Sequence, residues 1–282
     1  MLEKIKFTNH LNESMQWGSG GIYVKYNDLH DYAWDYSTDN DKISYFTRGI
    51  VKKTVPLVIC CASEQDGLTI KNRLLELAEK DVLAKQYGKI SIGDYFMRCY
   101  ITGSAKSNYL YHKGYLETSL TIASDCPQWT RETTTSFRIN GTSSGENGTV
   151  TLAKRNFDYN ADYPYDYANG MQRNTLNNTG FVGTDFKLIV YGAAVNPAIF
   201  IAGHLYQVNC TVESGEYLTI DSIQKTVVLT RNNGMTVNLF NERNRASYIF
   251  EKIPAGVNAV SWGGDYGFDV ILIEERSEPK WT

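Results

Sequence analysis

Short runs of alternating apolar and polar residues recur about every ten residues from residue 131 onward, and they constrain the fold more than any other feature. Each run is bounded by Gly, Asn, Asp or Pro. Such alternation predicts strands with one buried face, and regular turn signals between strands are typical of an antiparallel sandwich. The runs are SFRIN, GTVTLA, DFKLIVYG, AIFIAG, HLYQVNCTV, EYLTI, KTVVLT, TVNLF, SYIFEKI, NAVSW and FDVILIE. We therefore expect an antiparallel β-sandwich in residues 131–282.

The first part of the chain has a different pattern, which predicts an α+β domain over residues 1–130. Strand-like alternation occurs in residues 21–28 and again in residues 42–62. A single amphipathic helix follows, and strand signals resume after it. The whole chain is therefore expected to be mainly β, with two domains that meet near Trp129.

The predicted helix spans about residues 64–87. Ser63 is followed three residues later by an acid, which is a capping-box pattern. Gly67 weakens the first turn by roughly 1 kcal/mol, which would allow a start as late as Thr69. Gly88 is the expected glycine just after the helix. The apolar residues expected on the buried face are Leu68, Leu75, Ala78 and Val82.

Residues 28–46 are too polar for a core and too aromatic for a plain linker, and they predict a protruding hairpin or arm. The chain is 13% aromatic, with 20 Tyr, and aromatic side chains are enriched at protein interfaces. We interpret the segment as an arm that clasps a neighbouring subunit. The alternative is a locally packed loop. The candidate interface residues are Tyr32, Trp34, Tyr36, Tyr45 and Phe46.

A second aromatic segment, residues 154–180, interleaves tyrosines with acids. Exposed tyrosines could stack on sugar rings while the acids bond the sugar hydroxyls. The alternative is that the tyrosines seal the loop against the sandwich. The candidate glycan contacts are Tyr159, Asp162, Tyr163, Tyr165, Asp166 and Tyr167.

Charge and cysteine content exclude several classes of partner. The 28 Lys and Arg against 31 Asp and Glu leave a net charge of −3, so no basic field for nucleic acid is expected. The five cysteines are odd in number and lack C-x-x-C spacing, and Cys60 and Cys61 lie in an apolar run. We expect small buried side chains in a reducing compartment, with neither disulfides nor zinc.

No apolar run approaches the roughly 18 residues that a membrane span needs, and the N-terminus lacks the apolar core of a signal peptide. We therefore expect no membrane insertion. The chain is expected to be made in a cytoplasm and to stay soluble.

Catalytic patterns are weak. Ser143 lies in a G-x-S-x-G match, but the residues after it resemble a strand rather than the helix of a nucleophile elbow. The four histidines share no metal-ligand spacing, and Asp162 with Asp166 is the least poor acid pair for glycosidase chemistry. A loose calcium-like triad lacks the mid-loop Gly and the terminal Glu; its acids are Asp35, Asp39 and Asp41. We expect no enzyme, metal or cofactor.

Several segments in order resemble the distal tail proteins of long-tailed phages and prophage tail-like particles. The segments of the first part are NRLLELAEKDV, GKISIGDYFMRCYITGS and DCPQWT. Those of the second part are DYPYDYANG, FKLIVYGAAVNPAIFIAGHLYQVN, GEYLTIDSIQKTVVLT, NLFNERNRASYIFEKIPAGVNAVSW and RSEPKW. The resemblance covers nearly the whole chain.

The resemblance implies a structural virion protein without catalytic residues. Its first domain would close with other copies into a homohexameric ring, and its second would be a galectin-like sandwich. The implied partners are the tail-tube protein, the hub or tail-associated lysin, and the tape-measure protein. The implied location is the virion tail tip, with assembly in the host cytoplasm. A second hypothesis is a carbohydrate-binding module that attaches to cell-surface glycans.

Overall fold

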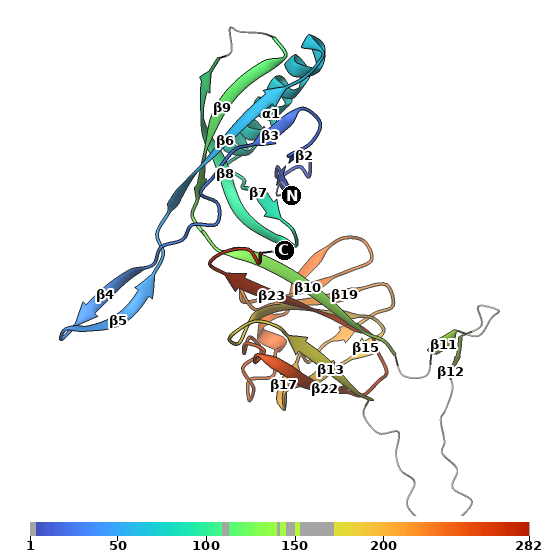
Figure 1. Cartoon of the computed structure of the whole chain (residues 1–282). Coiled ribbons are helices and arrows are strands. Elements are labelled where there is room, and N and C mark those ends of the chain that lie inside the picture. The colour runs from blue at the N-terminus through green and yellow to red at the C-terminus, as the bar shows by residue number, and fades with distance from the viewer. Residues whose placement is uncertain (1–3, 109–112, 140–141, 145–149, 153–171, 282) are drawn as a thin grey trace, which may run out of the picture. The chain divides into compact units, whose positions relative to one another are not determined.

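The structure, a computed structural model, covers most of the chain (Figure 1). It describes residues 4–108, 113–139, 142–144, 150–152 and 172–281. Within these residues the mainly β fold with one α-helix, predicted from the sequence, is confirmed.

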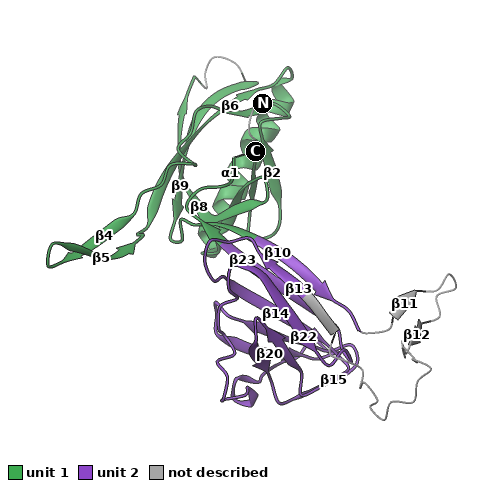
Figure 2. Cartoon of the chain, turned by 60° about the horizontal axis from the view of Figure 1, so that its bottom comes forward, with its two compact units in different colours: residues 1–131, 275–282 green, residues 132–274 purple. Residues whose placement is uncertain are grey.

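The chain divides into two compact units (Figure 2). Unit 1 comprises residues 1–131 together with residues 275–282, and unit 2 comprises residues 132–274. Residues 275–282 were expected in the second domain, whereas they belong to unit 1. The chain therefore passes twice between the units, once within β10 (Trp129–Phe137) and once within β23 (Phe268–Arg276).

Unit 1 is built on antiparallel strands in the order β2-β1-β7-β8-β9-β6-β3. Their bounds are β1 Ile5–Thr8, β2 Ser14–Trp17, β3 Ile22–Val24, β6 Val51–Cys60, β7 Gly88–Ile92, β8 Tyr95–Ser107 and β9 Tyr115–Ser124. The long strand β8 pairs with β7 along its first half and with β9 along its second. Every second residue of β9 is buried, so the alternation in the sequence becomes one core face.

The helix α1 (Glu64–Ala84) packs against β8 and β6. The Ser63 hydroxyl accepts hydrogen bonds from the amides of Gln65 and Asp66, so the predicted cap residue is confirmed. The helix begins at once rather than at Thr69, despite Gly67.

Two expectations about α1 were wrong. The core-facing residues are Gly67, Leu74, Leu77, Ala78 and Asp81, whereas three of the four residues predicted for the buried face are exposed. The cause is that the apolar residues of α1 cover one wide arc of the helix, so periodicity alone could not show which part of that arc meets the sheet. The helix also ends earlier, with Lys85 in the left-handed conformation (φ 54°), and Gly88 opens β7 instead of capping the helix.

Unit 2 packs two antiparallel sheets face to face. One has the order β10-β23-β14-β19-β20-β21 and the other β13-β22-β16-β17. The bounds not yet given are β13 Gln172–Asn178, β14 Asp185–Tyr191, β16 Ala198–Ile201, β17 His204–Gln207, β19 Tyr217–Asp221, β20 Thr226–Thr230, β21 Thr236–Asn238 and β22 Gly256–Trp262. The short pieces are β11 Thr142–Ser144, β12 Val150–Leu152, β15 Ala194–Val195, β18 Thr211–Val212 and the 3₁₀ turn Phe240–Glu242.

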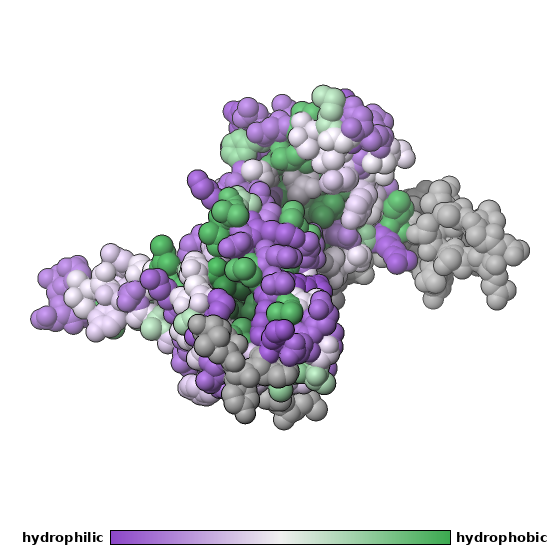
Figure 3. Space-filling view, turned by 90° about the horizontal axis from the view of Figure 1, so that it is seen from above, coloured by the Kyte–Doolittle hydropathy of each residue, from purple (hydrophilic) through white to green (hydrophobic). Residues whose placement is uncertain are grey.

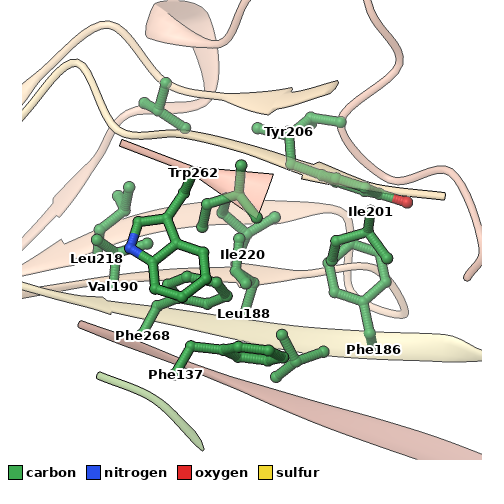
Figure 4. Close-up of a cluster of buried hydrophobic side chains, with 14 of the residues drawn as sticks. Phe137, Phe186, Leu188, Val190, Ile201, Tyr206, Leu218, Ile220, Trp262 and Phe268 are labelled. Carbon is green, nitrogen blue, oxygen red and sulfur yellow. The ribbon is translucent and has the colours of Figure 1, made fainter. Parts of the chain in front are cut away.

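The two sheets of unit 2 enclose an aromatic core (Figure 4). Phe137 and Phe268 stack with ring centroids 4.7 Å apart, and Trp262 meets Phe268 edge-on at 5.0 Å. The Trp262 indole N–H donates to the Tyr266 carbonyl at 3.0 Å, so this buried donor is satisfied. Part of the high aromatic content of the sequence therefore lies in this core.

Two local expectations in unit 2 also differ from the structure. SYIFEKI, residues 247–253, was expected to be a strand but forms turns and a single bridge, with Ile249, Phe250 and Ile253 buried. Side chains as well as backbone bonds satisfy its backbone: Asn178 donates to the Ile253 carbonyl and the Tyr206 hydroxyl donates to the Glu251 carbonyl. Conversely, β13 was not expected, because its sequence QRNTLNN lacks an apolar alternation.

Candidate self-association surface

The most distinctive feature of unit 1 is a hairpin that projects from its sheets, formed by β4 (Asp35–Asp39) and β5 (Lys42–Thr47) (Figure 1). We call residues 34–48 the arm. Asn40 and Asp41 form its two-residue loop and both have positive φ, 47° and 62°. Such loops match the twist of paired strands, and Asn and Asp tolerate this conformation. A local turn preference therefore shapes the arm.

The strand register gives the arm one apolar and one polar face. Tyr36 lies opposite Phe46, and Thr38 lies opposite Ile43, with a register shift between Ser37 and Thr38. Residues directly opposite one another share a face, as do residues two apart on one strand. The mainly apolar face therefore carries Trp34, Tyr36, Thr38, Ile43 and Phe46. The polar face carries Asp35, Ser37, Asp39, Lys42, Tyr45 and Thr47.

The large side chains of the arm are open to solvent. The exposed fractions are 43% for Trp34, 62% for Tyr36, 53% for Ile43, 57% for Tyr45 and 58% for Phe46. Figure 3 shows the arm projecting from the body, purple at its tip and pale along its length, as expected for a tyrosine-rich surface. A two-stranded hairpin alone is marginally stable in water. Burial of this aromatic face against another surface would therefore stabilise the hairpin.

Arg48 lies where the arm joins the rest of unit 1, and we call this junction the root of the arm. Its guanidinium lies 3.8 Å from the centre of the Trp34 ring, which in turn meets Phe46 edge-on at 6.3 Å. The same guanidinium donates to the Pro127 carbonyl at 3.2 Å and to the Ser277 hydroxyl. Burial lowers the pKa of this guanidinium. The side chain thus joins the arm to two other segments of unit 1.

Lys53 holds the segment that leads into the arm. It is 7% exposed, and its ammonium donates to the carbonyls of Asp28, at 2.7 Å, and Asp31. Burial lowers the pKa of this ammonium, and the nearby Asp28 and Asp31 oppose that shift. Lys53 and Arg48 also line a small pocket of about 210 Å³ beside Tyr32.

The C-terminal residues contribute to the same root. The His30 ring stacks on Trp281 with centroids 4.1 Å apart. With Ser277 on Arg48, this second contact joins residues 275–282 to the base of the arm. The position of the arm is therefore set by two segments distant in sequence, one at Pro127 and one at the C-terminus.

The structure places all five predicted interface residues at the arm or its root, and all are exposed. Tyr32 lies at the root and is 57% exposed, and the other four lie on the hairpin. Ile43 and Arg48 were not among the predicted interface residues. Ile43 could have been found from the alternation that ends at Phe46, but the Arg48 contact depends on packing.

The predicted glycan contacts, Tyr159, Asp162, Tyr163, Tyr165, Asp166 and Tyr167, lie outside the described residues. Ser143 lies in β11, which pairs with β12, so its backbone is not at the strand-to-helix turn of a nucleophile elbow. Asp35, Asp39 and Asp41 all lie on the exposed hairpin.

The described residues contain no cluster of three or more His, Cys, Asp or Glu suited to a metal ion. His10 instead pairs with the buried Asp81 at 2.6 Å, and the ring of His204 lies 2.9 Å from the Tyr248 carbonyl. All five cysteines are free, but only Cys99 is buried, whereas Cys60 is exposed and Cys61, Cys126 and Cys210 are half-buried, so the expectation of buried cysteines was wrong for these four. In the described part of the chain no helix is long and apolar enough to span a membrane.

No family model matches the sequence, and no curated protein matches it. Solved structures do match the fold over nearly the whole chain. The Dit protein (gp 19.1) of phage SPP1, described as a paradigm of the hub adsorption apparatus in Gram-positive infecting phages, has a TM-score of 0.58 at 10% identity, over 96% of this chain and 99% of its own.

A chain of the phage P2 baseplate, in its activated conformation with Ca, has a TM-score of 0.61 at 13% identity, over 99% of this chain and 100% of its own. The same baseplate with Sr gives 0.60 at 13% identity. The resemblance to phage tail-tip proteins expected from the sequence is therefore confirmed at the level of the fold.

Proposed function

We propose that this protein is a structural, non-enzymatic component of a phage tail tip. In this proposal six copies form a ring that joins the tail tube to the hub or tail-associated lysin, with the tape-measure protein as a further partner. The fold shared with SPP1 Dit and the P2 baseplate chain supports the tail-tip role. Assembly would take place in the host cytoplasm, and the finished ring would lie in the virion.

The main support for a ring is the arm with its exposed aromatic face. A contact between two different surfaces of identical subunits closes into a ring when the rotation between them closes. A projecting arm supplies one such surface. Its aromatic content is that of a protein interface, and its root is held by Arg48 and Lys53 so that it is presented in a defined direction.

Light scattering of the purified chain, alone and mixed with its tube and hub proteins, tests this proposal. We expect a mass of six copies, and negative-stain images that show a ring with a central hole. A chain that stays monomeric at high concentration and with both partners present would overturn the proposal.

A matched pair of double variants tests the role of the arm. Tyr36→Ser with Phe46→Ser removes two aromatic side chains from the apolar face. Ser37→Ala with Thr47→Ala changes their chain neighbours on the polar face. Truncation of a central interface aromatic costs about 2 kcal/mol or more, so the first pair should abolish assembly and the second should leave it intact.

The carbohydrate-binding alternative depends on Tyr159 to Tyr167, which lie outside the described residues, and it remains a prediction. Retention of the full chain on a glycan array or on host cell walls tests it. Loss of retention on replacing those tyrosines by serine, with ring assembly unchanged, would establish it as a separate activity.

A further inference from the structure

A small pocket at the root of the arm combines two cations with apolar walls. It has a volume of about 210 Å³, and both Arg48 and Lys53 line it. Lys53 is only 7% exposed, so its ammonium is withdrawn from water. The other lining residues are Asp31, Tyr32, Ala33, Val51 and Pro127. We call this space the root pocket.

Both cations keep hydrogen-bond donors that the protein does not use. Of the five N–H groups of an arginine, Arg48 commits one to the Pro127 carbonyl and one to the Ser277 hydroxyl. Its Nε is buried without a hydrogen-bond partner. Lys53 commits two of its three N–H groups, to the carbonyls of Asp28 and Asp31. Because a buried donor costs free energy when it is left unsatisfied, these groups favour an additional acceptor.

The charges of the two cations also lack an anion in direct contact. None of the ion pairs of the described residues involves Arg48 or Lys53. Burial lowers the pKa of both groups, and the nearby acids oppose this shift without cancelling it. An anion in the root pocket would stabilise both charges. The charge of the pocket is therefore complementary to an anionic ligand.

The remaining walls select the kind of anion. Ala33, Val51 and Pro127 offer carbon rather than donors, so an anion with oxygens on all sides, such as sulfate, would leave some of them unsatisfied. Asp31 also lines the pocket, and its carboxylate would repel a second negative charge on the ligand. At roughly 30 Å³ for each water-sized group, the pocket has room for about seven non-hydrogen atoms. A monocarboxylate with a short aliphatic body meets all three conditions.

Arg48 connects such a ligand to the arm. Its guanidinium lies over the Trp34 ring, with the central carbon 3.8 Å from the ring centre, so the ring meets the face of the guanidinium. A carboxylate binds in the plane of a guanidinium instead, and both partners therefore fit at once. A carboxylate that fixes Arg48 also fixes the ring that Arg48 contacts. The arm should therefore open less often while the ligand is bound.

We propose that the root pocket binds a monocarboxylate with a short aliphatic body, and that the bound carboxylate holds the arm in place. The carboxylate accepts hydrogen bonds from Arg48 and Lys53, and the aliphatic part lies against Val51 and Pro127. This binding concerns one chain and does not depend on the proposed ring, so the failure of either proposal leaves the other standing.

Ligand-observed NMR on the full chain tests the binding, because saturation transfer works for a single chain and for an assembly alike. The probes are butanoate, its neutral isostere butanamide, and sulfate, at constant ionic strength. Butanoate should bind at least about tenfold more tightly than butanamide, because only the acid pairs with the two cations. Sulfate should not displace butanoate.

Two variants locate the site. Lys53→Met removes one cation, and Ala33→Leu fills the pocket from an exposed position while both cations stay. Each should weaken butanoate binding at least about tenfold. Lys52→Met removes the same charge from an exposed neighbour and should bind as the wild type does. If Lys53→Met fails to fold, Ala33→Leu decides the question, because it leaves the hydrogen bonds of Lys53 in place.

A further probe distinguishes the source of the carboxylate. N-acetylalanine imitates the C-terminal residue of a polypeptide, whereas butanoate imitates a free short-chain acid. Tighter binding of N-acetylalanine assigns the pocket to a polypeptide terminus, and tighter binding of butanoate assigns it to a free acid. Either result supports a carboxylate site.

Hydrogen exchange tests the effect on the arm. At ten times its Kd, a ligand that binds only the ordered root should slow the exchange of β4 and β5 about tenfold. Butanamide at the same concentration should leave that exchange unchanged. Binding of butanoate without any slowing would overturn the coupling between the pocket and the arm.

Three other outcomes would overturn the site itself. In the first, neither acid binds up to about 50 mM, the weakest affinity expected for a ligand of six non-hydrogen atoms. In the second, butanamide or sulfate binds as tightly as butanoate, so the pocket does not select a monocarboxylate. In the third, Ala33→Leu binds butanoate as the wild type does, which would place the ligand elsewhere.

Discussion

Replacing Arg48 by alanine should loosen the arm without unfolding unit 1. The side chain contacts Trp34 by cation–π geometry at 3.8 Å and bonds both the Pro127 carbonyl and the Ser277 hydroxyl. Because Arg48 is half-buried, we take the low end of each contribution: about 0.5 kcal/mol for the ring contact and about 1.5 kcal/mol for the charged hydrogen bonds. The arm should therefore open about 30-fold more often, since 1.36 kcal/mol is a factor of ten.

Hydrogen exchange followed by mass spectrometry measures this opening directly. Peptides from β4 and β5 should exchange about 30-fold faster in Arg48→Ala, while peptides from β6 and β9 keep their wild-type rates. Arg48→Lys keeps the charge but lacks the planar guanidinium, so it should fall between the two. Lys52→Ala removes an equal charge from an exposed neighbour and should change nothing.

Two results would refute this reasoning. Unchanged exchange of the arm in Arg48→Ala would show that the root contacts do not hold it. Faster exchange throughout unit 1 would show that Arg48 stabilises the whole unit rather than the arm.

Three further predictions concern single side chains. Asn178→Ala should lower the free energy of unfolding of unit 2 by about 2–4 kcal/mol, because the substitution leaves the Ile253 and Pro254 carbonyls without this donor. The control, Asn177→Ala at the exposed neighbouring position, should change it little. Denaturant unfolding measures both. Gly67→Ala would stabilise an isolated helix by about 1 kcal/mol. In this structure it should destabilise unit 1 by about 1–3 kcal/mol, because the new Cβ would lie 2.6 Å from the Gly114 Cα. Calorimetry shows whether the melting temperature rises or falls. The hydrogen bond to Asp269 raises the pKa of Tyr191 to about 12. This phenol therefore stabilises the fold below pH 10 and loses that contribution as the pH rises towards 12. In Asp269→Asn, a ring-carbon NMR titration should show the pKa of Tyr191 moved back towards 10.

The parts of the fold that the sequence predicts are those set by local chemistry. The Ser63 hydroxyl caps α1 because it needs only the next turn of the same chain. The arm loop follows from Asn40 and Asp41, which favour positive φ. The strands β9 and β23 are predicted by alternating apolar and polar residues, because each strand has one buried face.

The parts that could not be predicted depend on which segments meet. Periodicity finds the wide apolar arc of α1 but does not say that Leu74 meets the sheet while Leu75 does not. Gly67 weakens a helix considered alone, yet the structure requires a glycine there because another backbone passes close by. Likewise, the arm aromatics were expected as interface residues, but Arg48 at their root was missed because its partners lie at residues 127 and 277.

The double crossing between the units has a consequence for proteolysis. Unit 2 is an insertion within unit 1, attached at residue 131 and again at residue 274. A protease that cuts the chain once inside unit 2 leaves each fragment joined to unit 1, and the strand pairing of the sandwich continues to hold the cut ends. Two cuts, one at each joint, are needed to release it. Limited digestion should therefore yield a nicked chain that still migrates as one folded molecule before unit 2 is lost.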